Sequence, residues 1–384
     1  MKLNACLTSD AWSNIKNKPI VNYMLISDSL TFFLDSVPTG EQNHNAKWIA
    51  QDMERMVDFL AEKVCGAVTD NTTTNQSAWS ILKKKYPSLF FQGCASHDGT
   101  HWFVKDIFDA TKPKKGKNVA NYPEKYPFHY LLEFVQKCKD FIQAIGKQKE
   151  SQQKIHDIIT DGKFVEFLDK AIMILNPVDT AVVVFQSDSV PVSQIYQSFA
   201  NTMKEQYNMM SCLSGAERSY LLQLLQSRLD FLYGDAIGIA YLLDPRFVGK
   251  KMTAFERTRV EDLIFDYGSE TEQSQQMGKK EEMYLQYTNF VIKANHNKDR
   301  KDFRFLMLKK GTKTILQFWL VDGLEFSQLA RSCSAGVRYG CAQVPRQRGV
   351  FPPWGFVHSK LRSSLGSEKG EEESGVYQNK CFSV

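Results

Sequence analysis

The segment GAVTDNTTTNQSAW, residues 66–79, constrains the fold more than any other part of this sequence. Its small and β-branched residues predict a strand that is covered on both faces, and the strand ends on a carboxylate, Asp70. Strands covered on both faces are typical of parallel sheets, in which helices connect the strands and pack on them. Apolar residues at helical spacing over 45–64 predict such a helix immediately before this strand, so the sequence indicates an α/β fold.

The first hundred residues alternate between strand-like and helix-like segments. Short segments of β-branched or aromatic residues predict strands, and apolar residues three and four apart predict helices. The predicted strands are 3–10, 18–28, 30–37, 64–70 and 89–96, and the predicted helices are 45–64 and 75–87. Because the first three strands follow one another closely, we expect them to form an antiparallel meander.

The sequence changes character after the first hundred or so residues. Apolar residues recur at spacings of three and four over most of 122–287, which predicts a mostly helical region. Within it, 176–191 predicts a loop or an extended piece, and 281–296 predicts a further helix. From 332 to 356 the sequence is rich in Gly, Pro, Arg and Ser without any period, so regular structure is not expected there.

The composition favours a soluble intracellular protein without a membrane partner. Hydrophobic residues make up 43% and charged residues 24%, a balance typical of globular chains rather than disordered ones. No apolar run reaches the roughly 18–20 residues of a membrane helix, and the N-terminus lacks the profile of a signal peptide. The eight cysteines are scattered, so we expect reduced, individually placed thiols rather than a disulfide framework.

Basic residues cluster although the net charge is only +5. The segment KPKKGK places four lysines in six residues: Lys112, Lys114, Lys115 and Lys117. The stretch 326–367 contains arginines and lysines but neither Asp nor Glu. Such clusters bind phosphates through counterion release, which predicts weak, non-specific, salt-dependent binding of nucleic acid. A solvated loop and a disordered tail explain the same residues, and both interpretations stay open.

Two acidic residues end predicted strands, Asp10 the first strand and Asp70 the fourth. If these strands are neighbours, the two carboxylates face each other. Cleavage of nucleic acid by two metal ions needs carboxylates that hold the ions about 3.5–4 Å apart. Mg²⁺ prefers oxygen ligands and keeps several waters, so two or three carboxylates suffice. The alternative is that each Asp only caps the turn or helix that follows it.

Several motifs, in order along the chain, resemble those of one family. They are the acid before Trp-Ser in LTSDAWS, the TDN of VTDNTTTNQSAW, the Cys-x-x-His of FFQGCASH, the Leu-Asp-Pro-Arg of AYLLDPRF, and the pieces QFW and GFVHSKLRSSL. With these motifs the sequence resembles the hAT superfamily of DNA transposases, and more narrowly the transposase-like proteins of eukaryotic genomes. The resemblance covers most of the chain.

The resemblance implies an α/β fold with a ribonuclease H-like mixed sheet that a large all-helical insertion interrupts. The first part of the core is then 1–120, and the insertion is 121–290. A return to the core and the start of a dimerisation region occupy 291–330. The remainder, 331–384, is expected to be a degraded and largely disordered part of the dimerisation region.

The resemblance also implies a chemistry. In the ribonuclease H-like fold the first and fourth strands are neighbours, so Asp10 and Asp70 are implied to be metal ligands, with Mg²⁺ as the cofactor. The family's reaction is hydrolysis and strand transfer at transposon ends. Cys94 and His97 match the family's Cys-x-x-His motif. For these two residues we favour structural packing near the DNA-facing part of the core over metal binding.

A third acidic ligand, which the family carries in a Ser-rich segment near the C-terminus, is missing here. No Asp or Glu lies between Glu325 and Glu368, although familiar sequence resumes at Gly355. Our hypothesis is a local frameshift over about 331–353, in a decayed gene or a mis-called reading frame. Glu325 substitutes for the missing ligand only if the chain folds there unlike the family.

Three interpretations of function follow. The first is a nuclear hAT transposase-derived protein, catalytically inactive, that retains weak DNA binding and forms a homodimer. No Cys-x-x-Cys with paired histidines occurs, so we do not expect site-specific recognition of transposon ends by a zinc finger. The second is an active Mg²⁺-dependent transposase. The third is a protein-protein interaction module without a nucleic-acid role, with apolar surface exposed around Phe318 and Trp319.

Overall fold

The computed structural model of this chain describes most of the first 330 residues. The described residues are 5–13, 19–27, 30–38, 45–60, 64–87, 89–95, 102–109, 127–128, 131–145, 152–185, 190–267, 276–299, 303–327 and 329. The predicted tail and the basic KPKKGK segment lie outside these residues, so the expectations for them stay predictions.

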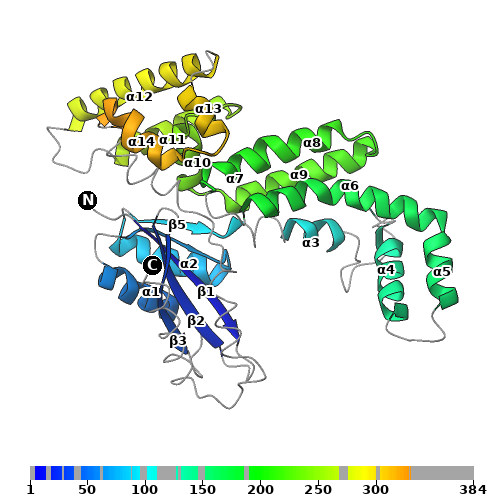
Figure 1. Cartoon of the computed structure of the whole chain (residues 1–384). Helices are drawn as coiled ribbons and strands as arrows, with labels where there is room; N and C mark the ends of the chain where they lie inside the picture. Colours follow the sequence, from blue (N-terminus) through cyan, green and yellow to red (C-terminus); the bar gives the residue numbers. More distant parts are fainter. Residues whose placement is uncertain are drawn as a thin grey trace. The chain divides into compact units, whose positions relative to one another are not determined.

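Five strands form one mixed sheet in the order β3-β2-β1-β4-β5 (Figure 1). They are β1 (Ala5–Ser13), β2 (Pro19–Ser27), β3 (Leu30–Pro38), β4 (Val64–Thr69) and β5 (Phe90–Gly93). β2 pairs antiparallel with both β1 and β3, whereas β4 pairs parallel with both β1 and β5. The predicted meander is confirmed, and so is the predicted contact between the first and fourth strands.

Two helices connect the parallel strands and cover one face of the sheet. α1 (Ala46–Leu60) joins β3 to β4, and α2 (Thr73–Lys85) joins β4 to β5, since parallel strands need a crossover connection. We call the sheet face that these helices cover the α1 face. Its buried cluster comprises Leu7, Val21, Tyr23, Ala67, Leu89 and Phe91 with Ala50, Met53, Met56, Val57, Leu60, Ala78 and Leu82 among others. Four apolar residues of α1 at helical spacing, Met53, Met56, Val57 and Leu60, are therefore among those that it buries.

The opposite side of the sheet, which we call the second face, is also covered at β5. Side chains alternate along a strand, so Phe90 faces away from its neighbour Phe91, which lies on the α1 face. Phe90 belongs to a separate buried cluster, to which α10 (Asp235–Leu243) contributes Ile239 and Leu242. The side chains described on β4 are buried, as expected for a strand covered on both faces.

The described residues divide into two compact units. Unit 1 contains those of Met1–Cys94, Gln186–Ile195 and Tyr233–Val384, and unit 2 contains those of Ala95–Phe185 and Tyr196–Leu232. The helices from α10 onward therefore group with the sheet, and the residues of the predicted insertion are shared between the two units.

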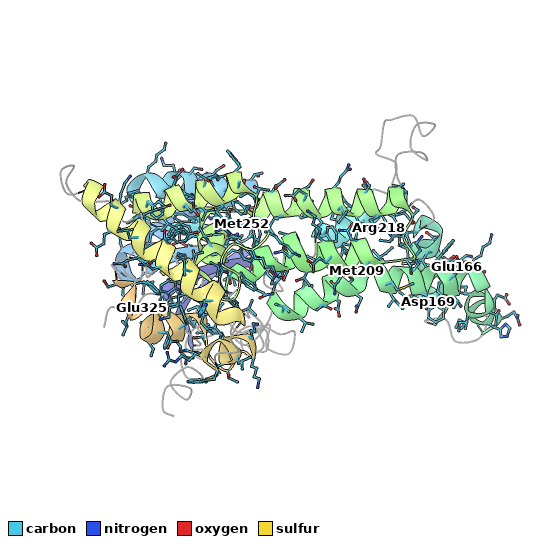
Figure 2. The ribbon with its side chains drawn as sticks, turned by 90° about the horizontal axis from the view of Figure 1, so that it is seen from above. Glu166, Asp169, Met209, Arg218, Met252 and Glu325 are labelled. Carbon is cyan, nitrogen blue, oxygen red and sulfur yellow. The ribbon has the colours of Figure 1, made fainter. Side chains whose placement is uncertain are left out.

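Unit 2 is helical, as the apolar periodicity predicts. Its elements are α3 (Trp102–Asp109), α4 (Leu131–Ile145), α5 (Gln152–Thr160), α6 (Gly162–Phe185), the π-helix η4 (Gln197–Met203), α8 (Lys204–Met209) and α9 (Gly215–Leu232), and the short α7 (Ser193–Tyr196) lies at the boundary between the units. Arg218 of α9, labelled in Figure 2, donates hydrogen bonds to the backbone oxygens of Tyr207 and Met210 and so satisfies the end of α8.

The predicted loop or extended piece at 176–191 is wrong for its first part, because α6 runs through Pro177 to Phe185. A proline inside a helix removes a backbone hydrogen bond and costs about 3 kcal/mol. Here the ring is buried together with Ile174, Val178 and Ala181 on the same helix. Burial of that apolar face offsets the local cost, so tertiary packing overrides the propensity of a single residue.

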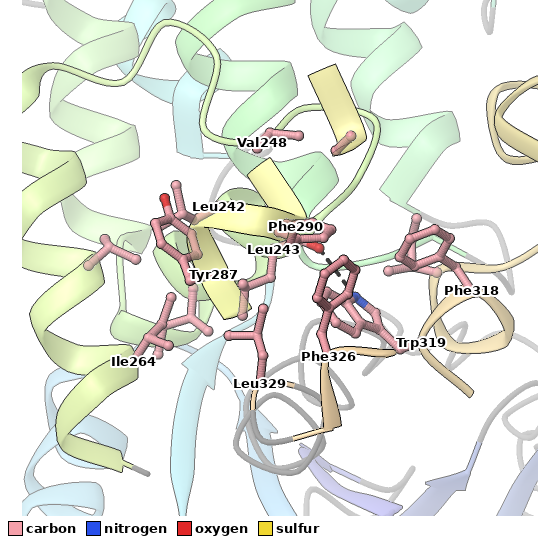
Figure 3. Close-up of a cluster of buried hydrophobic side chains, with 14 of the residues drawn as sticks. Leu242, Leu243, Val248, Ile264, Tyr287, Phe290, Phe318, Trp319, Phe326 and Leu329 are labelled. Carbon is pink, nitrogen blue, oxygen red and sulfur yellow. Dashed lines mark hydrogen bonds between the residues drawn. The ribbon is translucent and has the colours of Figure 1, made fainter. Parts of the chain in front are cut away.

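The remaining helices of unit 1 enclose a large aromatic cluster. They are α10, α11 (Ala254–Tyr267), α12 (Gln276–Asp299), α13 (Phe303–Lys309), α14 (Ile315–Val321) and the 3-10 helix η5 (Asp322–Glu325). Trp319 packs against Phe290 in this cluster and donates its indole N–H to the backbone oxygen of Leu243 at 3.2 Å (Figure 3). Phe318 and Trp319 are only 5% and 6% exposed, so these two side chains do not form the exposed apolar surface that the sequence predicts, whereas their neighbours Val321 and Leu324 are exposed.

The Leu-Asp-Pro-Arg motif forms a turn that is anchored by a buried ion pair. The Asp244 carboxylate is fully buried and accepts hydrogen bonds from the Arg246 guanidinium at 2.7 Å and from the Ser193 hydroxyl at 2.7 Å. The backbone oxygen of Asp244 accepts bonds from the next turn, including one from Val248 at 2.8 Å. Arg257 donates to the backbone oxygens of Val248 and Gly249, both of which have positive φ. This motif is therefore a structural corner of unit 1.

None of the described helices combines the length and the apolar content that a membrane crossing requires.

Replacing Met53 by Ala tests the cluster on the α1 face. Met53 is completely buried, so the substitution leaves a cavity and should lower the free energy of unfolding by about 2–5 kcal/mol. Phe59→Ala on the same helix is the control, because Phe59 is 77% exposed and its loss should change stability by less than about 0.5 kcal/mol. Hydrogen exchange of the β4 amides, followed by mass spectrometry, measures the change. Equal protection in the two variants would contradict this packing.

Candidate functional site

Asp10 and Asp70 lie at the same level on neighbouring strands, but only Asp70 follows a strand end. The predicted strand end at Asp10 is wrong, because pairing with β2 continues β1 to Ser13. In the parallel pair β1–β4, Thr8 is the partner of Val68. Two residues further along the chain, Asp10 lies on β1 and Asp70 lies directly after the end of β4. Neighbouring strands are about 4.8 Å apart, so the fold brings these two residues to adjacent positions. Both are half-buried and reach the solvent.

Alternation along the strands gives Asp10 its face of the sheet. Leu7 lies on the α1 face, and side chains alternate along a strand, so Thr8 and Asp10 lie on the second face. Asp10 is paired with Asn22 on β2, and Asn22 is paired with Ser36 on β3. These three residues form what we call the polar row, which runs across the sheet from β3 to β1. All three positions of this row on the second face carry polar residues, whereas the buried cluster of the α1 face is largely apolar.

Within the polar row, Asn22 and Ser36 are buried and hydrogen-bonded to each other. Asn22 is 5% exposed and Ser36 is 6% exposed. The Ser36 hydroxyl donates a hydrogen bond of 2.8 Å to the Asn22 side-chain oxygen. A buried polar pair of this kind is stable only because its members satisfy each other. Sequence inspection missed both residues, and an Asn within a β-branched strand was the only signal that could have revealed them.

Hydrogen bonds fix the chain around Asp70. Its backbone oxygen accepts one bond from the Thr69 hydroxyl and one from the Asn75 amide nitrogen, both at 2.8 Å. The backbone N–H of Cys94, just after β5, donates to the Thr69 oxygen at 2.9 Å. The end of β4 is therefore held from α2 and from β5.

Thr72, rather than Asp70, is the N-cap of α2. The Thr72 side chain accepts a hydrogen bond from the backbone N–H of Asn75. The helix start is thus satisfied without the Asp70 carboxylate, which counts against the simple capping role that was the alternative for this residue. Asn71 is buried beside Gly93, where an added Cβ would come within 2.6 Å of the Asn71 Cβ, so the small residue is required there.

The donor set fits a divalent cation that keeps several waters. Two carboxylates at adjacent positions, both half-buried, are oxygen ligands of the kind that Mg²⁺ prefers. Among the described residues, no group of three or more His, Cys, Asp or Glu side chains is placed to hold a metal ion. Glu325, the substitute considered for the third ligand, forms an ion pair with Lys293 of α12 on the helical part of unit 1 (Figure 2).

The other predicted site residues are only partly described. Cys94 is a half-buried free thiol that follows β5. Its partner His97 lies outside the described residues, and so do Lys112, Lys114, Lys115 and Lys117. Their proposed roles stay predictions. Cys6, Cys138 and Cys212 are also free thiols.

Burial controls the protonation of two groups on the strands beside Asp10, the Cys6 thiol and the Tyr23 hydroxyl. Cys6 lies on β1 two positions before Thr8, and burial raises the pKa of its thiol to about 12, so it stays protonated and inert at neutral pH. On the α1 face, burial raises the pKa of Tyr23, whose hydroxyl donates to Asp52 at 2.7 Å. Neither group is therefore available as a base or nucleophile at neutral pH.

Comparison with known proteins gives one family match. Residues 3–121 match the family described as Domain of unknown function (DUF659), which is found in hAT-type transposase-like proteins. The matched stretch includes the whole sheet and both Asp10 and Asp70. No curated protein matches the chain.

Replacing Thr8 by Val tests the packing beneath the two carboxylates. Thr8 is fully buried, and its hydroxyl has no hydrogen-bond partner among the described residues. Removing an unsatisfied buried hydroxyl while keeping the shape should raise the free energy of unfolding by about 1 kcal/mol.

Thr69→Val is the matched control for this substitution. Thr69 is equally buried, but its hydroxyl donates to Asp70, so its loss should lower stability by about 0.5–1.5 kcal/mol. Urea denaturation of both variants gives the comparison. Destabilisation of the same size in both would show that Thr8 also has a partner, such as a buried water.

Proposed function

We propose that this chain is a hAT transposase-derived nuclear protein with a ribonuclease H-like core that binds a divalent cation and DNA but does not cut DNA. The observation that carries the proposal is the parallel pair β1–β4, which brings Asp10 level with Asp70. Two further findings support it. The neighbouring positions of β1 and β4 in the sheet agree with what the sequence resemblance implies for the first and fourth strands. The family match covers this same part of the chain.

Asp10 and Asp70 have complementary roles in the proposed site. Asp10 lies within β1, where the cross-strand pairing with Asn22 of β2 fixes its backbone. Asp70 follows the end of β4, where Thr69 and Asn75 hold its backbone oxygen. Together they would hold Mg²⁺. When bound, this ion polarises phosphate oxygens and neutralises their charge.

The absence of cleavage is proposed from the sequence rather than from the site itself. Two-ion cleavage in the family uses a third carboxylate, and 326–367 contains no acidic residue. Glu325, directly before that stretch, is engaged with Lys293. A core with two carboxylates is therefore proposed to bind the ion and the DNA backbone without activating a water for attack.

DNA binding is proposed to depend on the lysine-rich segment 112–117, which follows α3 in the sequence. Lys112, Lys114, Lys115 and Lys117 supply the charge, and the contacts are to phosphates, so the binding is non-specific. A homodimer through the C-terminal region stays part of the proposal.

Titration with Mn²⁺, followed by electron paramagnetic resonance, tests the proposed ion site. The wild-type chain should bind Mn²⁺ in competition with Mg²⁺, and Asp10→Asn or Asp70→Asn should each weaken binding by about tenfold or more, since even outer-shell substitutions cost that much. Asp262→Asn is the control, because this exposed residue lies on α11. Unchanged affinity in Asp10→Asn and Asp70→Asn would rule out the proposed site.

Mobility shifts at several salt concentrations test the proposed DNA binding. Each phosphate contact adds about 0.9 to the slope of log K against log salt, so replacing all four lysines by Ala should reduce the slope by about 3–4. The control replaces the exposed Lys309 and Lys310 of unit 1. An affinity that does not fall between low and high salt would contradict electrostatic binding.

An active Mg²⁺-dependent transposase is the second candidate, and the level placement of Asp10 and Asp70 favours it. Incubation with supercoiled plasmid and Mg²⁺ separates the two candidates. The proposed inactive protein leaves the plasmid intact. Nicking that disappears in Asp70→Asn would establish the active enzyme instead.

A further inference from the structure

We propose that the helical part of unit 1 contains a second ligand site, a cavity that binds a small carboxylic acid with a single aromatic ring. The cavity lies in the aromatic cluster, and its lining residues come from α12, α13, α14, η5 and the residue after η5. It shares no described residue with the ion site at Asp10 and Asp70, and neither proposal depends on the other.

Buried apolar side chains form the inner end of this cavity, which measures about 110 Å³ and is partly enclosed. Each of them is at most 6% exposed, and they are Ala294, Phe290, Phe305, Phe318 and Phe326. Figure 3 shows Phe290, Phe318 and Phe326 within the cluster. None of these side chains has a hydrogen-bond donor or acceptor, so the inner end favours an apolar group.

The arrangement of the rings suits one further aromatic ring. The Phe290 centroid lies 6.5 Å from that of Phe318 and 5.8 Å from that of Phe326, and both pairs meet edge to face. Aromatic rings prefer such contacts at centroid distances of about 4.5–7 Å. An enclosed apolar cavity of about 150 Å³ in another protein binds benzene. The slightly smaller cavity here is open on one side, so it accommodates a ring whose substituent extends outward.

Charged side chains line the outer end of the cavity. Lys293 and Arg304 are exposed, and Asp322 is half-buried. Lys293 forms an ion pair with Glu325. Asp322 forms an ion pair with Lys313. These five residues together carry one excess positive charge, so the outer end attracts an anion in preference to a cation.

A carboxylate fits the two basic groups at this end. The side chains of Lys293 and Glu325 are both 46% exposed, and ion pairs at such exposure contribute little to stability. A ligand carboxylate therefore competes with Glu325 for the Lys293 ammonium group. The Arg304 guanidinium binds carboxylates through two parallel hydrogen bonds. A ring joined to a carboxylate in one small molecule satisfies both ends of the cavity.

Fluorine NMR of the full chain with para-fluorobenzoate as the probe tests this proposal. The wild-type chain should bind the probe, and Ala294→Leu should weaken binding by about tenfold or more, because the larger side chain takes the place of the ring. Ala254→Leu is the matched control, since it makes the same substitution at an exposed position of α11. Affinities are corrected for the folded fraction from circular dichroism.

The same measurement tests the role of charge. Fluorobenzene and para-fluorobenzylamine carry the same ring without the carboxylate, so each should bind about threefold or more weakly than para-fluorobenzoate. Arg304→Gln should weaken binding of the acid by a similar factor and leave fluorobenzene unchanged. Lys309→Gln is the control for this substitution, because Lys309 is also an exposed cation of α13 but does not line the cavity.

Several outcomes would overturn the proposal. They are the absence of probe binding to the wild-type chain, equal affinities in Ala294→Leu and Ala254→Leu, and tighter binding of para-fluorobenzylamine than of para-fluorobenzoate. If Ala294→Leu did not fold, Arg304→Gln would decide, since wild-type affinity for the acid in that variant would overturn the proposal. Asp10→Asn should bind the probe as the wild-type chain does, which separates this cavity from the ion site.

Discussion

The parallel pairing of β1 with β4 is the constraint on which the sheet unit depends. Two parallel strands cannot be joined by a tight turn, so the chain between β3 and β4 must cross over the sheet, and it does so as α1. That helix then needs an apolar stripe to cover the sheet, which Met53, Met56, Val57 and Leu60 supply. The same pairing brings Asp10 of β1 level with Asp70, which follows the end of β4. The proposed chemistry therefore follows from a topological requirement.

The two faces of the sheet have different roles because of alternation. On the α1 face, the buried cluster is apolar apart from the Tyr23 hydroxyl, which donates to Asp52 of α1. On the second face, the polar row of Asp10, Asn22 and Ser36 interrupts the apolar surface, while Phe90 packs into the helical cluster of unit 1 at β5. A polar row on a largely buried sheet costs desolvation, which the Ser36–Asn22 bond offsets in part. Such a cost is expected where function requires it.

The helical cluster of unit 1 depends on a different device. Asp244, Arg246 and Ser193 form a buried polar network at the end of α10, and the adjacent Leu243 oxygen receives the indole N–H of Trp319. This bond connects segments 76 residues apart in the chain. The Leu-Asp-Pro-Arg motif is thus explained by folding. It requires no catalytic role.

Local patterns in the sequence were sufficient to determine the order of strands and helices in the first hundred residues, most of the buried stripe of α1, and the position of Asp70 at a strand end. These features depend on neighbours within a few residues, which periodicity reports directly. Only the tertiary structure decided that Pro177 continues α6, that Phe318 and Trp319 are buried, and that Asn22 and Ser36 lie beside Asp10. These outcomes depend on register and on contacts between distant segments, and a one-residue change of register would turn every side chain to the other face.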